Sequence, residues 1–161
     1  MPDKYPVTMA VRVLREHNVD FSHHPYEYEE RGGTEISARE LGVDEHAVIK
    51  TLIMEDDAKK PMIVLMHGDR EVSTKNLARQ LGVKSIAPCT PAVADRHSGY
   101  QVGGTSPFGT KRAMPVYMER TIAELPKIYV NGGKRGYLVG IAPIDVTGIL
   151  EPIMVDAATI E

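Results

Sequence analysis

The sequence predicts an α+β fold, in which helices flank a mixed β-sheet. Short runs rich in aliphatic and β-branched residues outnumber the segments with helical periodicity, and glycine, proline or charged residues separate these runs. Strands and helices do not alternate regularly along the chain, which argues against a nucleotide-binding fold with a parallel sheet. The chain of 161 residues has the usual size of one domain, and no repeat, low-complexity tract or linker divides it.

The first third of the chain is expected to form two helices and a strand. Apolar residues recur at helical spacing between residues 8 and 17, and an extended segment follows at residues 19–26. Residues 34–41 have the pattern of a short amphipathic helix. Thr34 and Ser37 offer hydroxyl groups that can cap its start.

Three further helices are expected, at residues 73–81, at residues 91–98 and after Pro143. Ser73 and Thr90 can cap the first two, and Thr90 precedes a proline at the first helical position. The β-rich runs are residues 48–54, 61–66, 115–118, 127–130 and 137–142, and the segment NGGKRG at 131–136 is typical of a hairpin turn.

The composition is that of an ordinary globular protein, with 42% hydrophobic and 25% charged residues. A formal net charge of -3 argues against a strongly electrostatic nucleic-acid binder. Between residues 84 and 136, however, eight cationic side chains stand against three acidic ones. This asymmetry permits a local basic face that meets phosphate groups, and it equally suits a solvated surface on which charges cluster.

Cysteine, histidine and apolar patterns limit the classes of protein. Cys89 is the only cysteine, so the chain has neither an intramolecular disulfide nor a Cys-x-x-Cys pair. The N-terminal segment lacks the apolar core of a secretion signal, and no run of 18 apolar residues is present. The six histidines lack zinc-site spacing. We therefore expect a cytoplasmic protein without a membrane span, a metal or a cofactor.

Lys50 interrupts an apolar row in the predicted strand 48–54. Side chains alternate between the two faces of a strand, so Lys50 shares a face with Val48, Leu52 and Met54. Burial of an unpaired ammonium group is costly, so Lys50 must reach water, pair with a negative group or lose its proton. A bound phosphate or carboxylate would meet this need. The alternative is a side chain that extends along the apolar surface to water.

The segment VGGTSPFGTKR at residues 102–112 combines adjacent glycines with a proline. Gly103 and Gly104 allow backbone amides to approach a ligand closely, and Pro107 restricts the loop. Such amides can stabilise the oxyanion that forms when an ester is cleaved, without a side-chain nucleophile. The alternative is a glycine-rich turn between strands.

No other group of residues has the pattern of a nucleophile or an acid–base pair. Cys89 and His97 lie on either side of a helix start, and we expect Cys89 to be a structural cysteine. The paired acidic residues lie in polar turns, where carboxylates keep ordinary acidity. Residues 129–136 combine glycines with two cations, which suits either a ligand-binding loop or an exposed hairpin.

Three separated segments occur in order along the chain: IKTL around Lys50, SGYQVGGTSPFG at 98–109 and IYVNGGKRG at 128–136. Together with the leading helix and the HHPYEY stretch, they resemble the signature stretches of the YbaK-like aminoacyl-tRNA deacylases, to which the editing domain of prolyl-tRNA synthetase is related. The resemblance spans nearly the whole chain. It implies one compact domain over residues 1–161, with a mixed, mostly antiparallel, barrel-like sheet and flanking helices.

The resemblance also implies an enzyme that cleaves the ester between an amino acid and the 3′ end of tRNA, without a cofactor. Lys50 corresponds to the essential lysine of the family, Gly103 to the glycine whose backbone faces the substrate carbonyl, and Tyr26 to a pocket aromatic. Lys50 is expected to hold the phosphate or ribose of the acceptor end while the 103–107 loop stabilises the oxyanion. Water or the substrate side chain attacks. The other residues expected to contact the substrate are Gly33, Thr51, Gly104, Thr105, Ser106, Pro107, Asn131, Gly132 and Leu138.

The expected substrate is Cys-tRNA(Pro), and prolyl-tRNA synthetase is a candidate partner beside the aminoacyl-tRNA. Cysteine-specific relatives carry a phenylalanine, a serine and often an aspartate where this chain has Gly33, Asn131 and Leu138. Loss of an aromatic wall at Gly33 reshapes the pocket, so alanine or another small amino acid is an alternative substrate. Two other functions remain open: a tRNA- or amino-acid-binding module without turnover, and an enzyme that forms a Schiff base on Lys50.

Overall fold

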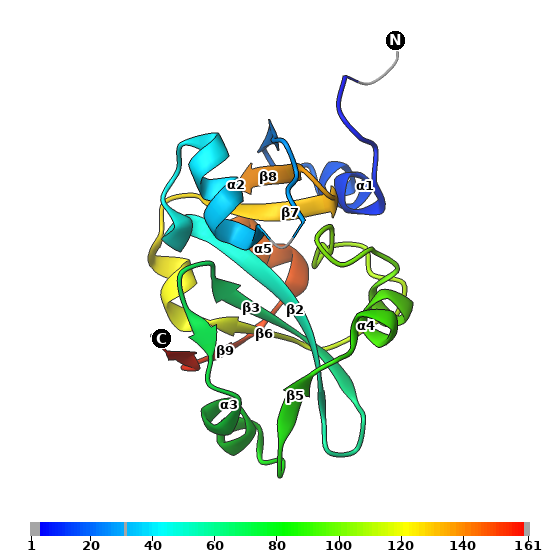
Figure 1. The fold of residues 1–161 in the computed structure, drawn as a ribbon, viewed down its shortest axis with the longest axis vertical. Helices are drawn as coiled ribbons and strands as arrows, with labels where there is room; N and C mark the ends of the chain where they lie inside the picture. Colours follow the sequence, from blue (N-terminus) through cyan, green and yellow to red (C-terminus); the bar gives the residue numbers. More distant parts are fainter. Residues whose placement is uncertain (1–3, 31, 160–161) are drawn as a thin grey trace.

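A mixed β-sheet forms the centre of the computed structural model, which describes residues 4–30 and 32–159 (Figure 1). The predicted domain 1–161 therefore extends slightly beyond the described residues. The strands are β1 (Phe21–Pro25), β2 (Val48–Asp56), β3 (Pro61–His67), β4 (Glu71–Val72), β5 (Ile86–Pro88), β6 (Val116–Glu119), β7 (Ile128–Lys134), β8 (Tyr137–Ile141), β9 (Ile153–Val155) and β10 (Ala158–Thr159).

Eight of these strands pair in one sheet, in the order β1-β8-β7-β2-β3-β6-β9, with β5 paired to β2. β2 is antiparallel to β3 and to β5 but parallel to β7, and β3, β6 and β9 run parallel to one another. This mixture confirms the predicted α+β class. The strand path does not close into a barrel among the described residues, because β1 and β9 end it at opposite edges. β4 and β10 form a separate two-stranded sheet.

All five predicted helices are present, and short 3-10 turns lie at Glu45–Ala47 and Arg120–Glu124. The helices are α1 (Met9–Glu16), α2 (Gly33–Leu41), α3 (Thr74–Leu81), α4 (Pro91–Ser98) and α5 (Pro143–Leu150).

Two of the predicted helix caps are confirmed, and one is wrong. The Ser73 hydroxyl accepts a hydrogen bond from the Asn76 amide, and Thr90 caps α4 in the same way. For α2 the cap position is Gly32, which has no side-chain hydrogen bond. The Thr34 hydroxyl instead donates to Glu45 Oε2 at 2.7 Å and to the Gly68 carbonyl at 3.1 Å. A tertiary contact thus replaces the local cap.

The strands that the sequence did not reveal are the shortest ones, β4, β5, β9 and β10, each of which has two or three residues. A run of that length carries too little alternation to be recognised. The predicted hairpin is present, but β7 continues through the paired glycines to Lys134. A register shift between Asn131 and Lys134 accommodates them, and only Arg135 and Gly136 connect β7 to β8.

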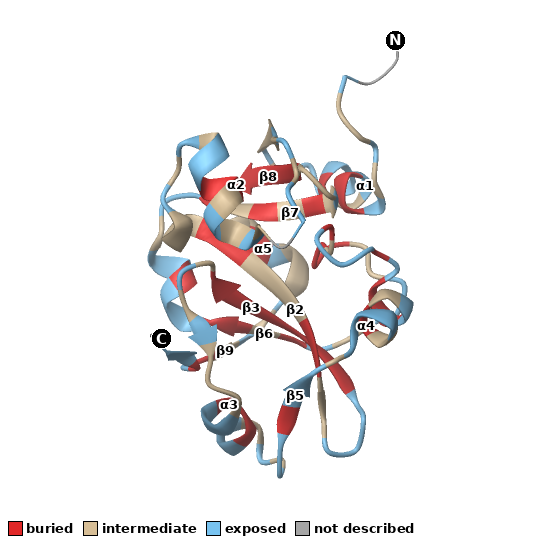
Figure 2. Ribbon diagram, viewed as in Figure 1, coloured by how far each residue is buried: buried red, intermediate tan, exposed pale blue. Residues whose placement is uncertain are grey.

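Most residues of the central strands are buried (Figure 2), and apolar side chains pack on both faces of the sheet. On one face α1, α4 and α5 contribute to a large cluster that includes Ile49 and Ile53 of β2. On the other face Leu77 of α3 packs with Met54, and Ala38 of α2 packs with Val48. The faces of β2 therefore alternate as the period-two pattern predicts.

β2 has neighbours on both sides except in its middle. Its parallel pairing with β7 covers only Val48 and Ile49, and its antiparallel pairing with β5 begins at Met54. Between these points, residues 50–52 pair only with β3. The sheet therefore has an opening along one edge of β2.

Candidate active site

A cavity of about 580 Å³ lies at this opening. Its volume is within the range of small-molecule sites. Four parts of the chain meet there: the segment that leads into α2, the middle of β2, the start of α4, and the glycine loop with the adjoining hairpin. Of the residues predicted to form the site, eight line the cavity: Tyr26, Gly33, Lys50, Thr51, Gly103, Thr105, Asn131 and Leu138.

Thr51 lies in the part of β2 where the opening occurs. Successive strand residues direct their backbone groups to opposite edges. The Val48 carbonyl accepts a hydrogen bond from Gly68, which directly follows β3, whereas the Ile53 carbonyl accepts one from Cys89 on the other side. The backbone N–H and C=O of Thr51 consequently point to the edge where neither β7 nor β5 pairs with it. Its buried hydroxyl also has no hydrogen-bond partner among the described residues. Thr51 thus has two backbone groups directed at the opening and a buried hydroxyl group without a partner among the described residues.

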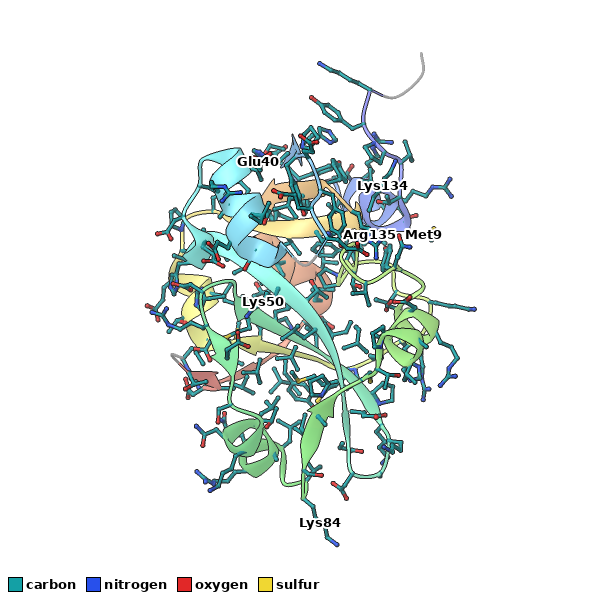
Figure 3. All side chains as sticks on the ribbon, in the orientation of Figure 1. Met9, Glu40, Lys50, Lys84, Lys134 and Arg135 are labelled. Carbon is teal, nitrogen blue, oxygen red and sulfur yellow. The ribbon has the colours of Figure 1, made fainter. Side chains whose placement is uncertain are left out.

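Lys50 belongs to β2 and lies below α2 in the view of Figure 3. Its Nζ donates a hydrogen bond to the Arg70 carbonyl at 2.5 Å and lies 3.5 Å from Glu71 Oε1. The Lys50 side chain is 19% exposed. The ammonium group is thus paired with a carboxylate, which is one of the outcomes that the sequence allowed, and Lys50 is among the residues that line the cavity.

The glycine loop adopts a conformation that requires glycine at position 103. Gly103 has φ +90°, and a Cβ there would lie 2.5 Å from the Tyr28 hydroxyl. The Gly104 amide already donates to the Gln101 carbonyl at 2.7 Å. Among the described residues, no hydrogen-bond acceptor is found for the Gly103 amide.

Asn131 holds the glycine loop against the hairpin. Its Oδ1 accepts hydrogen bonds from the amides of Gly133 and Lys134, at 2.7 and 3.2 Å, and its Nδ2 donates to the Gly103 carbonyl at 3.0 Å. The Asn131 side chain therefore lines the cavity and at the same time positions the backbone of Gly103.

Four predicted site residues lie behind the cavity wall rather than on it: Gly104, Ser106, Pro107 and Gly132. A Cβ on Gly104 would lie 2.8 Å from the backbone nitrogen of Arg135, and a Cβ on Gly132 would lie 2.4 Å from a ring carbon of Tyr137. Gly104 thus allows close packing between the loop and the hairpin, and Gly132 allows close packing within the hairpin. Ser106 is buried and its hydroxyl accepts a hydrogen bond from the Phe108 amide.

Tyr28, Cys89 and Arg135 line the cavity although the sequence did not single them out as site residues. The Arg135 guanidinium lies 5.1 Å from the Tyr28 ring centroid, and its Nε donates to the Val102 carbonyl at 2.8 Å. Tyr28 follows Tyr26 by two residues, so the alternation of an extended strand could have indicated it. Arg135 is one of the two cations of residues 129–136, for which the sequence left a ligand-binding loop and an exposed hairpin open.

The pKa values of Cys89 and Tyr26 are both raised above their ordinary values. Burial, together with the nearby Glu55 carboxylate, raises the pKa of the Cys89 thiol. Burial and the neighbouring Tyr28 also raise the pKa of the Tyr26 phenol. His97 lies beside Arg112 at 3.5 Å, and burial lowers its pKa.

The described residues contain one cluster with the ligand types of a metal site: His46, His67 and Asp69. Both ring nitrogens of His67 already have partners, the His46 carbonyl and the Thr121 hydroxyl, each at 2.7 Å. The His46 ring stacks on His67 with centroids 3.7 Å apart, and its Nδ1 contacts Asp69 at 2.7 Å. A metal ion would have to break these hydrogen bonds, so the geometry favours a structural network.

The cations of residues 84–136 do not gather on one face. Lys134 and Arg135 lie near Met9 at one end of the molecule, whereas Lys84 lies at the opposite end (Figure 3). The cations therefore do not form one basic face, because β5 and the β7–β8 hairpin occupy distant parts of the sheet. Of these eight cations, Arg135 is the one among the residues that line the cavity.

Comparison with known proteins identifies the family. The model of the aminoacyl-tRNA editing domain matches residues 30–148, and the chain belongs to this family. A protein of Enterococcus faecalis named as a candidate Cys-tRNA(Pro)/Cys-tRNA(Cys) deacylase, EbsC, is 28% identical over 137 residues, 84% of each chain. The family and this relative place the chain among the ester-cleaving aminoacyl-tRNA deacylases.

Other relatives agree with this assignment. A proline–tRNA ligase of Thermodesulfovibrio yellowstonii is 32% identical over 107 residues, but the matched segment is only 18% of the ligase. The fold is shared with the crystal structure of a candidate trans-editing enzyme for prolyl-tRNA synthetase, at a TM-score of 0.81 and 17% identity over 96% of this chain and 99% of that one. Among the described helices, none is long and apolar enough to cross a membrane.

Proposed function

We propose that the chain deacylates mischarged tRNA(Pro), with cysteine as the first candidate amino acid. The observation that supports this function best is the cavity at the interrupted edge of β2. There Lys50 and Thr51 of β2 meet Gly103, which is distant in the sequence. The names of the E. faecalis relative and of the structural neighbour point to the same substrate class. We also propose that residues 1–161 act as one editing domain in the cytoplasm.

In this proposal the cavity receives the terminal aminoacyl-adenosine of tRNA. The unpaired backbone and hydroxyl groups of Thr51 bind polar atoms of the aminoacyl group, and the Gly103 amide donates to the ester carbonyl oxygen as it becomes an oxyanion. Loss of one such donor typically costs about 10²- to 10³-fold in rate. Lys50 attracts the phosphate or ribose of the acceptor end. Water or the substrate thiol attacks the carbonyl carbon, and the ribose oxygen leaves.

Alanine on tRNA(Pro) is the second candidate, and the reason is the geometry at Gly33. This residue has φ +59°, and no atom lies within 4 Å of the position that its Cβ would take. The cavity is therefore open where cysteine-specific relatives carry an aromatic side chain. A hydrophobic pocket distinguishes substrates that differ by one methylene only by about 10- to 200-fold, so a change in this wall is able to alter the preferred amino acid.

The test is the release of amino acid from tRNAs charged with cysteine, alanine, serine and proline. We expect the wild type to release cysteine from tRNA(Pro) fastest, and Lys50→Ala to lose about a hundredfold in rate because the acceptor end is no longer held. Lys84→Ala, which removes an exposed lysine at the far end of the molecule, is the matched control and is expected to retain full activity. A wild type that binds charged tRNA without releasing any amino acid would instead establish a binding module.

A further inference from the structure

The contacts that hold Lys50 come from a turn that the sequence pattern did not indicate. The Lys50 ammonium donates to the Arg70 carbonyl at 2.5 Å and lies 3.5 Å from a Glu71 carboxylate oxygen. The Lys50 side chain is 19% exposed and the Glu71 side chain is 56% exposed. Since an ammonium group has three N–H donors, one donor remains for a ligand when the other two are directed at Arg70 and Glu71.

The position of Glu71 depends on the C-terminal end of the chain. Glu71 belongs to β4, which pairs with β10 so that Glu71 lies opposite Thr159. The Ser73 amide donates to the Ala157 carbonyl at 2.7 Å and extends this pairing. A pair of strands with two residues each is not stable by itself, so another part of the molecule must hold β10.

The carboxylate of Glu119 supplies that support. Glu119 is 3% exposed, and its Oε1 accepts hydrogen bonds from the amides of Ala157 and Ala158 at 2.8 and 3.0 Å. Its Oε2 accepts from the amide and the hydroxyl of Thr121, at 3.4 and 3.1 Å. Hydrogen bonds to an ionised acceptor are stronger than neutral ones, and buried donors that lose them are left unsatisfied. We call Glu119 and residues 157–159 the C-terminal clasp.

We propose that Glu71 is a positioning residue for Lys50, and that the C-terminal clasp holds Glu71 in place. The proposal rests on the deacylase function proposed above, in which Lys50 contacts the acceptor end. Glu71 fixes the direction of the ammonium group and leaves one N–H toward the cavity. The same carboxylate also carries a negative charge close to where the tRNA phosphate binds, so it improves the geometry of Lys50 and weakens its attraction for the anion.

Because Glu71 acts in these two ways, its removal is expected to affect kcat and KM separately. Glu71→Gln keeps the size and a hydrogen-bonding oxygen but removes the charge. We expect kcat to fall about two- to fivefold, in keeping with the modest strength of an ion pair with an exposed partner. KM is expected to stay equal or to fall, because one negative charge near the acceptor phosphate is gone. A residue with a merely structural role would lower stability without this split.

Asp156→Asn is the matched control for Glu71→Gln. Asp156 is also exposed, at 66%, forms an ion pair with Arg120 at 3.0 Å and precedes the clasp directly, but it does not contact Lys50. The control is expected to have wild-type kcat and KM. Equal kcat and KM for the wild type and Glu71→Gln would overturn the positioning role.

The link from the clasp to Glu71 is tested with a double-mutant cycle. Glu119→Gln keeps an acceptor for the amides of the clasp but loses the charge. We expect it to lower kcat, and the double variant Glu71→Gln/Glu119→Gln to have no lower kcat than the more affected single variant, because both changes act on Lys50 through Glu71. Losses that multiply in the double variant would show that Glu119 does not act through Glu71.

A second measurement separates this inference from the proposed deacylase activity. The ammonium protons of Lys50 are observed by NMR of the protein with ¹⁵N-labelled lysine, and Lys50→Arg assigns the signal. Hydrogen bonding slows exchange with water, so the Lys50 signal is expected in the wild type and in Asp156→Asn but broadened in Glu71→Gln. A wild type inert toward every charged tRNA would reject the deacylase and leave this readout in place. An unchanged Lys50 signal in Glu71→Gln would show that Glu71 does not position the Lys50 ammonium group.

Discussion

At Gly103, backbone conformation and side-chain space both exclude a larger residue. Its φ of +90° lies in the region that favours glycine, and a Cβ would meet the Tyr28 hydroxyl at 2.5 Å. Asn131 holds the Gly103 carbonyl from the other side, at 3.0 Å. The Gly103 amide is therefore held at the cavity by residues that do not themselves take part in bond cleavage.

Gly103→Ala is expected to reduce deacylation by about tenfold or more, because a displaced amide no longer meets the oxyanion. Gly82→Ala is the control: Gly82 has φ +73° at the end of α3, with no atom within 4 Å of its Cβ position. Both variants carry backbone strain, so both should lose thermal stability. Only Gly103→Ala should lose kcat, and full activity in that variant would remove the Gly103 amide from the mechanism.

At the scale of the elements, two glycines in regular structure have opposite surroundings. Gly148 lies in the exposed part of α5, and no atom lies within 4 Å of its Cβ position. Gly132 lies in β7, where a Cβ would be 2.4 Å from the ring of Tyr137, which is only 1% exposed. Gly132 is therefore needed for the packing of the β7–β8 hairpin, whereas Gly148 weakens its helix.

We expect Gly148→Ala to raise the free energy of unfolding by about 0.5–1 kcal/mol, since alanine restricts the unfolded chain and favours the helix. Gly132→Ala should lower the free energy of unfolding by about 1–3 kcal/mol through overpacking against Tyr137. Urea denaturation of the two variants and the wild type measures both changes. Equal stability of all three proteins would show that the hairpin yields to the extra methyl group.

At the scale of the whole molecule, buried neutral histidines couple stability to pH. His67 is fully buried, with hydrogen bonds to the His46 carbonyl and the Thr121 hydroxyl. Burial lowers its pKa, and burial also lowers the pKa values of His24 and His97. The folded chain therefore binds fewer protons than the unfolded chain below the ordinary histidine pKa of about 6.5.

Stability is accordingly expected to be constant between about pH 7 and pH 8 and to be lost as the pH falls below about 6.5 toward the lowered pKa values of the folded state. Urea denaturation at pH 7.5 and pH 5.5 tests this, in a range where most carboxylates remain ionised. His67→Gln, which removes the titrating group and keeps polar atoms, should show a smaller difference between the two pH values. If the variant declines as steeply as the wild type, His67 does not contribute to the pH dependence.

The amino-acid sequence by itself predicted the α+β class, the five helices and the longer strands, and it drew attention to Lys50 and to the glycine loop at Gly103 as candidate site residues. These features follow from local periodicity, from capping residues and from motifs that stay close together along the chain. Only the tertiary structure showed that β2 lacks a neighbour at Thr51, that Glu71 and the C-terminal clasp hold Lys50, and that Lys84 lies far from Arg135. Strand order and register decide those contacts, and no local pattern encodes which distant segments become neighbours.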